Sequence, residues 1–268
     1  MKDYLKNNID QAQMADVLDE LPFWSAPFGL KLLEYVDYQL NITALDIGFG
    51  TGFRLTELAM RLGESSVIYG IDPWKEASSR AQQKINAFGI SNIRIIEGIA
   101  ESIPLDDASV DLIVSNNGIN NVNDIGKVIS ECSRILKTGG QFVLTMNTDN
   151  TMVEFYEQME IVLSELNLFD SIDLMHRYIY QKRRPIEEII SMLKRNGFVI
   201  RDLVHDQFDY RFADGSAMLN HYFIRVAFMD SWMGILPGDK VEPVFDAIES
   251  RLNQKAQKLG GIKLSVPH

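Results

Sequence analysis

Short apolar runs alternate with amphipathic stretches over the first 146 residues. The apolar runs are rich in leucine and β-branched residues, which predicts buried strands. Between them, apolar side chains recur at helical spacing, and several of these stretches end at a glycine. The expected strands cover residues 44–47, 66–71, 92–96, 110–115 and 141–146. The expected helices are one that ends at Gly63 and two more over residues 75–88 and 124–136. This alternation is typical of the doubly wound α/β class, in which right-handed helical crossovers join parallel strands.

Beyond residue 150 the regular alternation stops. Helices are expected over residues 151–166, 172–181, 185–197 and 241–258, and strands over residues 198–206 and 262–266. The first of these helices begins with Thr-Met-Val-Glu, in which Thr151 and Glu154 form a capping-box pattern. About two helices are therefore expected between the last two strands.

A glycine-rich turn follows the first expected strand and precedes an amphipathic helix. Its glycines are Gly48, Gly50 and Gly52. Glycine permits a positive φ and lets a ligand approach the backbone without meeting a Cβ. The helix that follows offers unpaired N–H groups and a partial positive charge at its start. The turn therefore predicts a site for a polar ligand. The alternative is a loop that merely turns the strand into the helix.

The glycine spacing separates two classes of cofactor site. Dinucleotide-binding loops read G-x-G-x-x-G, but here Phe53 stands where the third glycine would fall, and Asp46 lies two positions before the first. The run L-D-I-G-F-G-T-G (residues 45–52) closely resembles the first motif of class I S-adenosylmethionine-dependent methyltransferases. Three further segments resemble that family in the same order: G-I-A-E-S-I-P (98–104), D-D-A-S-V-D-L-I-V (106–114) and L-K-T-G-G (136–140). The resemblance covers about residues 43–146.

The resemblance implies a Rossmann-like sheet of seven mostly parallel strands with helices on both faces. In that family the last two strands form an antiparallel hairpin at the end of the sheet, and the helical insertions cover the substrate side. We therefore expect a single domain over residues 1–268. Its expected parts are an N-terminal helical cap (1–41), a cofactor-binding core (42–149) and substrate-side helices with the last two strands (150–268).

An acid at the end of the second expected strand is the candidate ribose ligand. Asp72 lies 20 positions after Gly52 (72 − 52), the distance at which a carboxylate accepts hydrogen bonds from ribose hydroxyls. The alternative is a structural cap of the next helix. Pro73 and Trp74 follow directly, and they are candidates for packing flat against adenine.

The resemblance assigns further cofactor contacts. It implies that the amides around Gly48, Gly50 and Gly52 hold the amino-acid end of S-adenosylmethionine, and that Asp46 orders this loop or meets the ammonium group. It also implies that Ala100 and Glu101 line the adenine site. Ile99 stands where the family usually has the acid that accepts the adenine amino group. That contact is therefore not carried over, and Glu101, a backbone carbonyl or water would take its place.

Four asparagines in six positions follow the fourth expected strand, at positions 116, 117, 120 and 121. Asparagine is common in caps and turns, and this explains some of them. We expect Asn116 to line the cofactor and Asn117 or Asn120 to orient the substrate. His221, in the C-terminal segments, is a candidate general base, needed only if the acceptor starts protonated. The alternative for His221 is a structural role.

The activity that the resemblance implies is methyl transfer from S-adenosylmethionine to a small-molecule acceptor by in-line displacement. Alignment supplies most of the catalysis in such a reaction. One alternative is an NAD-dependent oxidoreductase of Rossmann type, but Tyr180 is followed four positions on by Arg184 rather than by the lysine of a Tyr-x-x-x-Lys pair. The other is a non-catalytic protein that binds S-adenosylmethionine.

The composition of the chain limits which partners and which cellular compartment are expected. The formal net charge is −11, which argues against nucleic acid as a partner. Charges interrupt every apolar run before it reaches the length of a membrane span, and no signal-peptide core is expected at the polar N-terminus. Cys132 is the single cysteine, so we expect no intramolecular disulfide, a cytoplasmic location and a packing role for this residue. No His, Cys and Asp spacing predicts a metal site.

Three aromatic residues precede the nucleotide fold. Phe23, Trp24 and Phe28 lie in a segment that also holds two prolines. One hypothesis is that they cover the mouth of the cofactor or substrate site. The alternative is that they are ordinary core residues, and the sequence favours neither.

Overall fold

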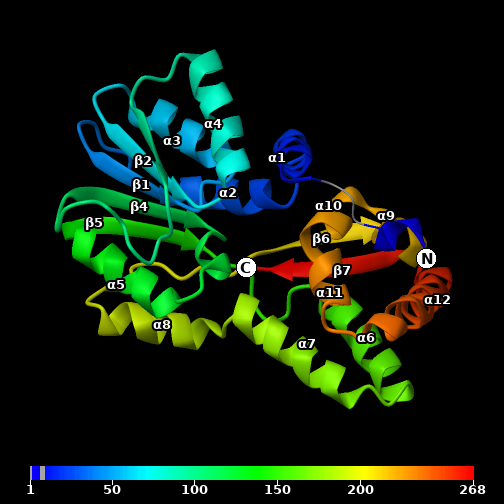
Figure 1. Ribbon diagram of the computed structural model, residues 1–268. Helices are drawn as coiled ribbons and strands as arrows, with labels where there is room; N and C mark the ends of the chain where they lie inside the picture. Colours follow the sequence, from blue (N-terminus) through cyan, green and yellow to red (C-terminus); the bar gives the residue numbers. More distant parts are fainter. Residues whose placement is uncertain (1, 7–9) are drawn as a thin grey trace. The chain divides into compact units, whose positions relative to one another are not determined.

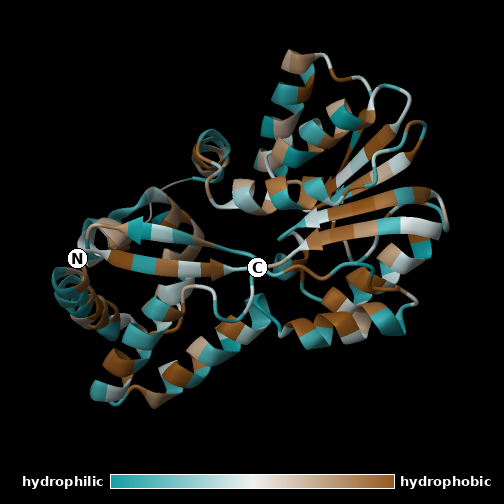
Figure 2. Cartoon of the chain, turned by 180° about the vertical axis from the view of Figure 1, so that it is seen from behind, coloured by the Kyte–Doolittle hydropathy of each residue, from teal (hydrophilic) through white to brown (hydrophobic). Residues whose placement is uncertain are grey.

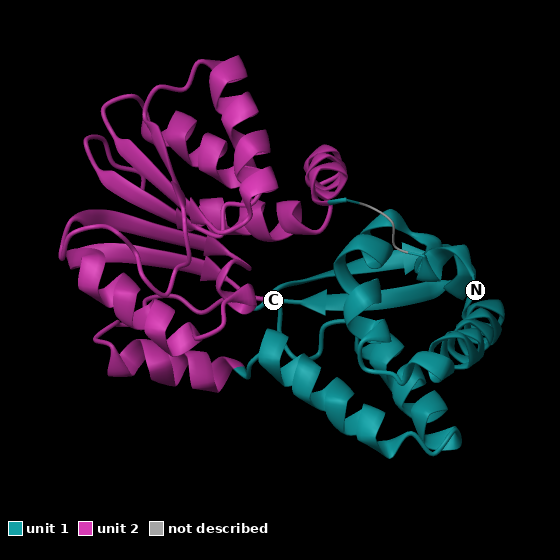
Figure 3. Cartoon of the chain, viewed as in Figure 1, with its two compact units in different colours: residues 1–10, 147–185, 205–268 teal, residues 11–146, 186–204 magenta. Residues whose placement is uncertain are grey.

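A computed structural model describes residues 2–6 and 10–268. The chain divides into two compact units, shown in different colours in Figure 3. The five-stranded unit comprises residues 11–146 and 186–204, and the two-stranded unit comprises residues 1–10, 147–185 and 205–268.

The five-stranded unit is built on a parallel sheet in the order β3-β2-β1-β4-β5 (Figure 1). Its strands are β1 (Thr43–Ile47), β2 (Val67–Asp72), β3 (Ile93–Glu97), β4 (Val110–Asn116) and β5 (Leu136–Thr145). The strand order reverses between β1 and β4. In open α/β sheets, ligands bind beyond the carboxyl ends of the strands at such a point.

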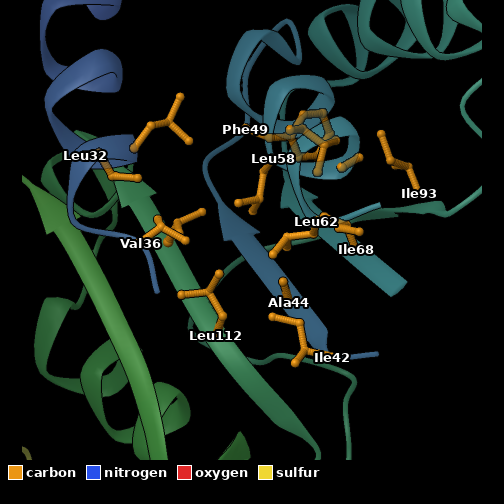
Figure 4. Close-up of a cluster of buried hydrophobic side chains, with 14 of the residues drawn as sticks. Leu32, Val36, Ile42, Ala44, Phe49, Leu58, Leu62, Ile68, Ile93 and Leu112 are labelled. Carbon is orange, nitrogen blue, oxygen red and sulfur yellow. The ribbon is translucent and has the colours of Figure 1, made fainter. Parts of the chain in front are cut away.

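Helices cover both faces of this sheet (Figure 1). The helices of the unit are α1 (Gln11–Glu20), which packs on α4, and α2 (Ser25–Glu34), α3 (Phe53–Leu62), α4 (Lys75–Phe88), α5 (Ile125–Ile135) and α8 (Ile186–Arg195), with the short η2 (Ile119–Asn121). One apolar cluster joins α2, α3 and α4 to the strands; Leu32, Leu58 and Leu112 belong to it (Figure 4). The second joins α5 and α8 to the strands through residues such as Ile129 and Ile189. The predicted doubly wound α/β class is confirmed.

The hydropathy of the elements explains these two layers. Strands buried on both faces carry hydrophobic residues along their length, while the helices combine hydrophobic and hydrophilic positions (Figure 2). Helix α1 has a different attachment. Its Asp19 pairs with Arg80 and Lys84 of α4, so charged side chains hold this helix to the unit.

The two-stranded unit is mostly helical around an antiparallel pair of strands. Its elements are η1 (Asp3–Leu5), α6 (Val153–Glu165), α7 (Phe169–Lys182), β6 (Gln207–Phe212), α9 (Gly215–Asn220), α10 (Tyr222–Ile224), the π-helical turn η3 (Arg225–Met229), α11 (Asp230–Met233), η4 (Gly238–Lys240), α12 (Val241–Leu259) and β7 (Ile262–Pro267). Strands β6 and β7 pair from Gln207↔Pro267 to Phe212↔Ile262. The two oxygens of Glu154 on α6 accept from the amide (2.9 Å) and hydroxyl (2.5 Å) of Ser265 on β7.

Three expectations about the C-terminal half need correction. The seven expected strands form a five-stranded sheet and a separate two-stranded sheet. Residues 198–206 are not a strand, and β6 begins at Gln207. Phe198 and Ile200 pack on the cluster beneath α5 and α8, with the Phe198 ring 5.6 Å from that of Phe142. The apolar residues of this segment therefore pack on the helices' cluster although the segment forms no strand hydrogen bonds. The expected capping box is also absent, since Met152 is the N-cap of α6 and Glu154 binds Ser265.

Within the described ranges, no helix is both long and apolar enough to cross a membrane. Cys132 lies on α5 and is fully buried in the cluster shared with α8. The predicted packing role of this cysteine is therefore confirmed.

Burial has a chemical consequence for Cys132. It raises the pKa of the thiol far above its ordinary value, and the thiolate is the reactive form. We expect no detectable reaction of the folded protein with a disulfide reagent such as dithionitrobenzoate at mildly alkaline pH, and one thiol released per chain in guanidinium chloride. Rapid reaction of the folded protein would contradict this burial.

Candidate functional site

The glycine loop between β1 and α3 lies at the carboxyl end of the sheet. All three of its glycines have positive φ, at 71°, 56° and 86° for Gly48, Gly50 and Gly52. The Gly48 amide donates to the Ile71 carbonyl (2.9 Å) and the Gly50 amide donates to Asp72 Oδ2 (2.8 Å). The loop is therefore tied to the end of β2 at two points.

The surroundings of the three glycines differ. A Cβ on Gly48 would lie 2.6 Å from Gly118 Cα, and one on Gly52 would lie 2.7 Å from Ala81 Cβ. A Cβ on Gly50 would meet no atom within 4 Å. Gly48 and Gly52 thus allow neighbouring backbone and helix to approach, whereas Gly50 borders open space. Gly50 is the position at which a ligand can reach the backbone.

Asp72 lies beside Gly50 and is 8% exposed. Its Oδ2 accepts from the Gly50 amide and its Oδ1 accepts from the Trp74 amide, each at 2.8 Å. Burial raises the pKa of Asp72 above its ordinary value, and these two amide hydrogen bonds oppose the shift. Each carboxylate oxygen can accept a second hydrogen bond. Asp72 therefore orders the glycine loop while keeping acceptor capacity for two hydroxyl donors.

The contacts of Asp72 are not those of an N-cap of the following helix, which was the alternative role. Helix α4 begins at Lys75 with Trp74 as its N-cap, and Asp72 binds the amide of that N-cap rather than an amide of the first helical turn. The Trp74 indole is half-buried, and its Nε1 donates to no acceptor in the part of the chain that the structure describes. Pro73 is exposed.

Asp46 is fully buried beneath the glycine loop. Arg54 Nη2 donates to Asp46 Oδ1 (3.2 Å) and to the Gly48 carbonyl (3.0 Å). Burial raises the pKa of Asp46, and the charge of Arg54 opposes this shift. Of the two roles expected for Asp46, these contacts support ordering of the loop. Sequence reasoning missed Arg54, although a cation in the first turn of a helix is unfavourable and was the available signal.

Ala100 and Glu101 follow β3. Ala100 is buried and Ile99 is exposed. Glu101 Oε1 accepts from the amides of Asn123 (2.8 Å) and Asp124 (3.2 Å), so this carboxylate holds the segment that leads into α5. The role of Glu101 at adenine stays a prediction.

Asn116 ends β4 and is buried. Its Nδ2 donates to the Ser25 carbonyl (3.0 Å), and its Oδ1 accepts from Thr145 Oγ1 (2.6 Å). The side chain thus joins the start of α2 to the ends of β4 and β5. Ser25 and Thr145 were not identified from the sequence, because they lie 91 and 29 positions away.

The structure brings Asn117 and Asn120 together. Asn117 has a φ of 56°, and its Oδ1 accepts from Asn120 Nδ2 (3.4 Å). Gly118 lies between them, and a Cβ at this position would lie only 2.3 Å from the Ile47 carbonyl oxygen. The loop after β4 can therefore approach β1 closely only with glycine there. Sequence reasoning missed this glycine.

His221 belongs to the two-stranded unit, between α9 and α10. Its ring lies 5.3 Å from that of Phe212 and 4.7 Å from that of Tyr222, between centroids. Burial lowers the pKa of this histidine, so its imidazole is neutral at neutral pH and has a nitrogen able to accept a proton. Its role as a base stays a prediction.

The three aromatic residues near the N-terminus differ in burial. Phe28 is fully buried, whereas Phe23 is 65% exposed. The Trp24 and Phe28 rings lie 5.8 Å apart. Phe28 is thus a core residue, as one alternative expected, while the covering role of Phe23 and Trp24 stays a hypothesis. Across residues 2–6 and 10–268, no group of three or more His, Cys, Asp or Glu side chains is placed to hold a metal ion.

Part of the chain is similar to a known protein family. Residues 45–144 match the methyltransferase domain family. A demethylmenaquinone methyltransferase of Bacillus licheniformis is 34% identical over 125 residues, which are 47% of this chain and 53% of the relative. That of Geobacillus kaustophilus is 32% identical over 130 residues, which are 47% of this chain and 56% of the relative. The matched region thus spans about half the length of these curated relatives.

The fold has a known counterpart over a longer stretch. The crystal structure of the YcgJ protein of Bacillus subtilis aligns with a TM-score of 0.60 at 20% identity, covering 90% of this chain and 94% of that one. At this identity the likeness concerns the fold.

Proposed function

We propose that the protein transfers a methyl group from S-adenosylmethionine to a small-molecule acceptor, as the match of residues 45–144 to the methyltransferase domain family suggests. The observation that carries this proposal is the pairing of Gly50 and Asp72. An open stretch of backbone and a carboxylate with spare acceptor capacity lie next to each other at the end of β1 and β2.

The residues present suit this cofactor. The amides of Gly48, Gly50 and Gly52 already donate within the chain, so other amides of this loop and of the first turn of α3 would receive a carboxylate tail. Asp72 retains an acceptor site on each oxygen, which matches a ribose diol. The indole of Trp74 offers a flat surface for adenine. Asp46 acts through Arg54, whose hydrogen bond to the Gly48 carbonyl orients the loop.

When bound, S-adenosylmethionine would supply an activated methyl group to the acceptor, with S-adenosylhomocysteine as the leaving group. The work of the chain is to align the acceptor and to exclude water. Asn117 and Asn120 are proposed to orient the acceptor. His221 is proposed to take a proton from an acceptor that starts protonated.

Charge and relatives support the class of acceptor. The net charge of −11 repels a phosphate backbone, which favours a small molecule over nucleic acid. The relatives from Geobacillus kaustophilus and Bacillus licheniformis are demethylmenaquinone methyltransferases. Because the match spans about half of their length, we carry over only the class of acceptor, a small molecule.

Calorimetry tests the cofactor and an enzyme assay tests the reaction. We expect the protein to bind S-adenosylmethionine and not NADH, and to release S-adenosylhomocysteine when an acceptor from a small-molecule panel is present. Binding of NADH alone would support a Rossmann-type oxidoreductase. Binding of S-adenosylmethionine without turnover across the panel would support a non-catalytic binding protein.

A further inference from the structure

Arg183, in the two-stranded unit, is a buried arginine that pairs with no acidic side chain among the residues that the structure describes. It is the C-cap residue of α7 and is 1% exposed. Its Nη1 donates to the Tyr156 hydroxyl (3.2 Å), and its guanidinium carbon lies 5.3 Å from the centroid of the Tyr156 ring. Over the described residues, no carboxylate forms an ion pair with it. An uncompensated buried charge is costly to folding, so its presence calls for a ligand or a structural reason.

Within the described residues, Arg183 hydrogen-bonds to a phenol rather than to a carboxylate. The Tyr156 hydroxyl also accepts from Trp232 Nε1 (3.1 Å). Tyr178 is hydrogen-bonded to Tyr156, and burial raises the pKa of Tyr178 to about 12, so this phenol is neutral at neutral pH. The buried guanidinium is therefore held by a phenol hydroxyl that two N–H donors share.

An aromatic cluster, defined as Phe155, Tyr156, Phe228 and Trp232, adjoins the arginine. The Trp232 ring stacks on those of Phe155 and Phe228, at centroid distances of 3.9 and 5.4 Å. Phe228 lies in the π-helical turn η3, immediately before α11, which carries Trp232. Such turns are rare and are frequent at functional sites. The cluster fixes the Tyr156 hydroxyl and thereby the orientation of Arg183.

The edge of the guanidinium formed by Nε and Nη2 donates no hydrogen bond to Tyr156. Nη1 is bound to Tyr156, while Nε has no acceptor within the described ranges. The N–H groups of Nε and Nη2 are parallel donors that match two oxygens of one anion. We propose that this edge of Arg183 binds the carboxylate or phosphate group of a small organic ligand whose apolar part contacts the aromatic cluster. The inference does not depend on the proposed function.

Thermal melting of the full chain with three aromatic probes tests this site. Benzoate and phenyl phosphate carry the two anions, and benzamide is the neutral counterpart of benzoate. We expect at least one anion to raise the melting temperature of the wild type, and benzamide to leave it unchanged. A response to benzoate alone assigns a carboxylate, and a response to phenyl phosphate alone assigns a phosphate. Absence of any response to either anion would overturn the proposal.

Substitution separates a ligand-binding arginine from a structural one. Arg183→Met should abolish the response to the anion while melting without probe at or above the wild-type temperature, because an uncompensated charge is removed. Arg183→Lys should weaken the affinity for the anion at least tenfold, because lysine lacks the two parallel N–H donors of the guanidinium. Arg184→Met, at the next position, is the matched control and should respond as the wild type does. Full response in Arg183→Met, or a marked loss of its melting temperature, would contradict the inference.

The proposed function and this inference fail separately. Binding of S-adenosylmethionine to Arg183→Met should equal that to the wild type. If the wild type binds S-adenosylmethionine but neither anion, the inference alone fails. If the anion binds through Arg183 and S-adenosylmethionine does not bind, the proposed function alone fails.

Discussion

Replacing Asp72 by alanine is expected to weaken the binding of S-adenosylmethionine by at least about 100-fold. The variant loses two hydrogen bonds from the ribose hydroxyls to a charged acceptor, together worth roughly 3–6 kcal/mol, and this exceeds the about 2.8 kcal/mol that corresponds to 100-fold. It also leaves the amides of Gly50 and Trp74 without their acceptor, so the glycine loop loses its anchor. Titration calorimetry with S-adenosylmethionine measures the effect. The affinity of Asp72→Asn should lie between those of the wild type and Asp72→Ala, because asparagine keeps one acceptor oxygen.

A second aspartate provides the control for this variant. Asp111 also accepts from a backbone amide, that of Thr43 (2.9 Å), and binds Lys137. It lies near the start of β4, at the amino end of the strands. Asp111→Ala should therefore lower stability without changing cofactor affinity. If Asp72→Ala folds cooperatively and binds S-adenosylmethionine as tightly as the wild type, Asp72 is not the ribose ligand.

Replacing Gly50 by alanine is expected to reduce cofactor affinity by at least about tenfold, with a modest cost to folding. The added Cβ meets no atom of the chain within 4 Å, so it projects into the space proposed for the ligand. The positive φ of 56° costs an alanine roughly 1–2 kcal/mol. Denaturant unfolding gives the loss of stability and calorimetry gives the loss of affinity.

Gly118→Ala is the matched variant, and its main expected effect is a loss of folding stability. Gly118 has a φ of −62°, which alanine adopts without strain, but its Cβ would lie 2.3 Å from the Ile47 carbonyl oxygen. Overpacking against backbone typically costs roughly 1–3 kcal/mol, and we expect the upper part of that range in denaturant unfolding. Full affinity in Gly50→Ala would show that the ligand does not approach the loop at this glycine.

The five parallel strands could be predicted from the sequence because each is a local apolar run. The structure moves their boundaries only slightly, apart from β5, which begins at Leu136 rather than at residue 141. The glycine loop and Asp72 were also readable from local spacing. A turn, a helix start and an acid at a set distance are properties of neighbouring residues, so one sequence contains them.

The contacts of the site residues were decided by the tertiary structure. Asp46 is paired with Arg54, Glu101 binds the amides of Asn123 and Asp124, and Asn116 binds Ser25 from 91 positions away. The last two strands pair with each other in a sheet of their own. Hydrogen bonds between distant segments depend on how packed elements meet in space. Local patterns of hydrophobic and polar residues therefore determined the strands and the glycine turn of this protein, and only the packed chain determined which atoms those side chains bind.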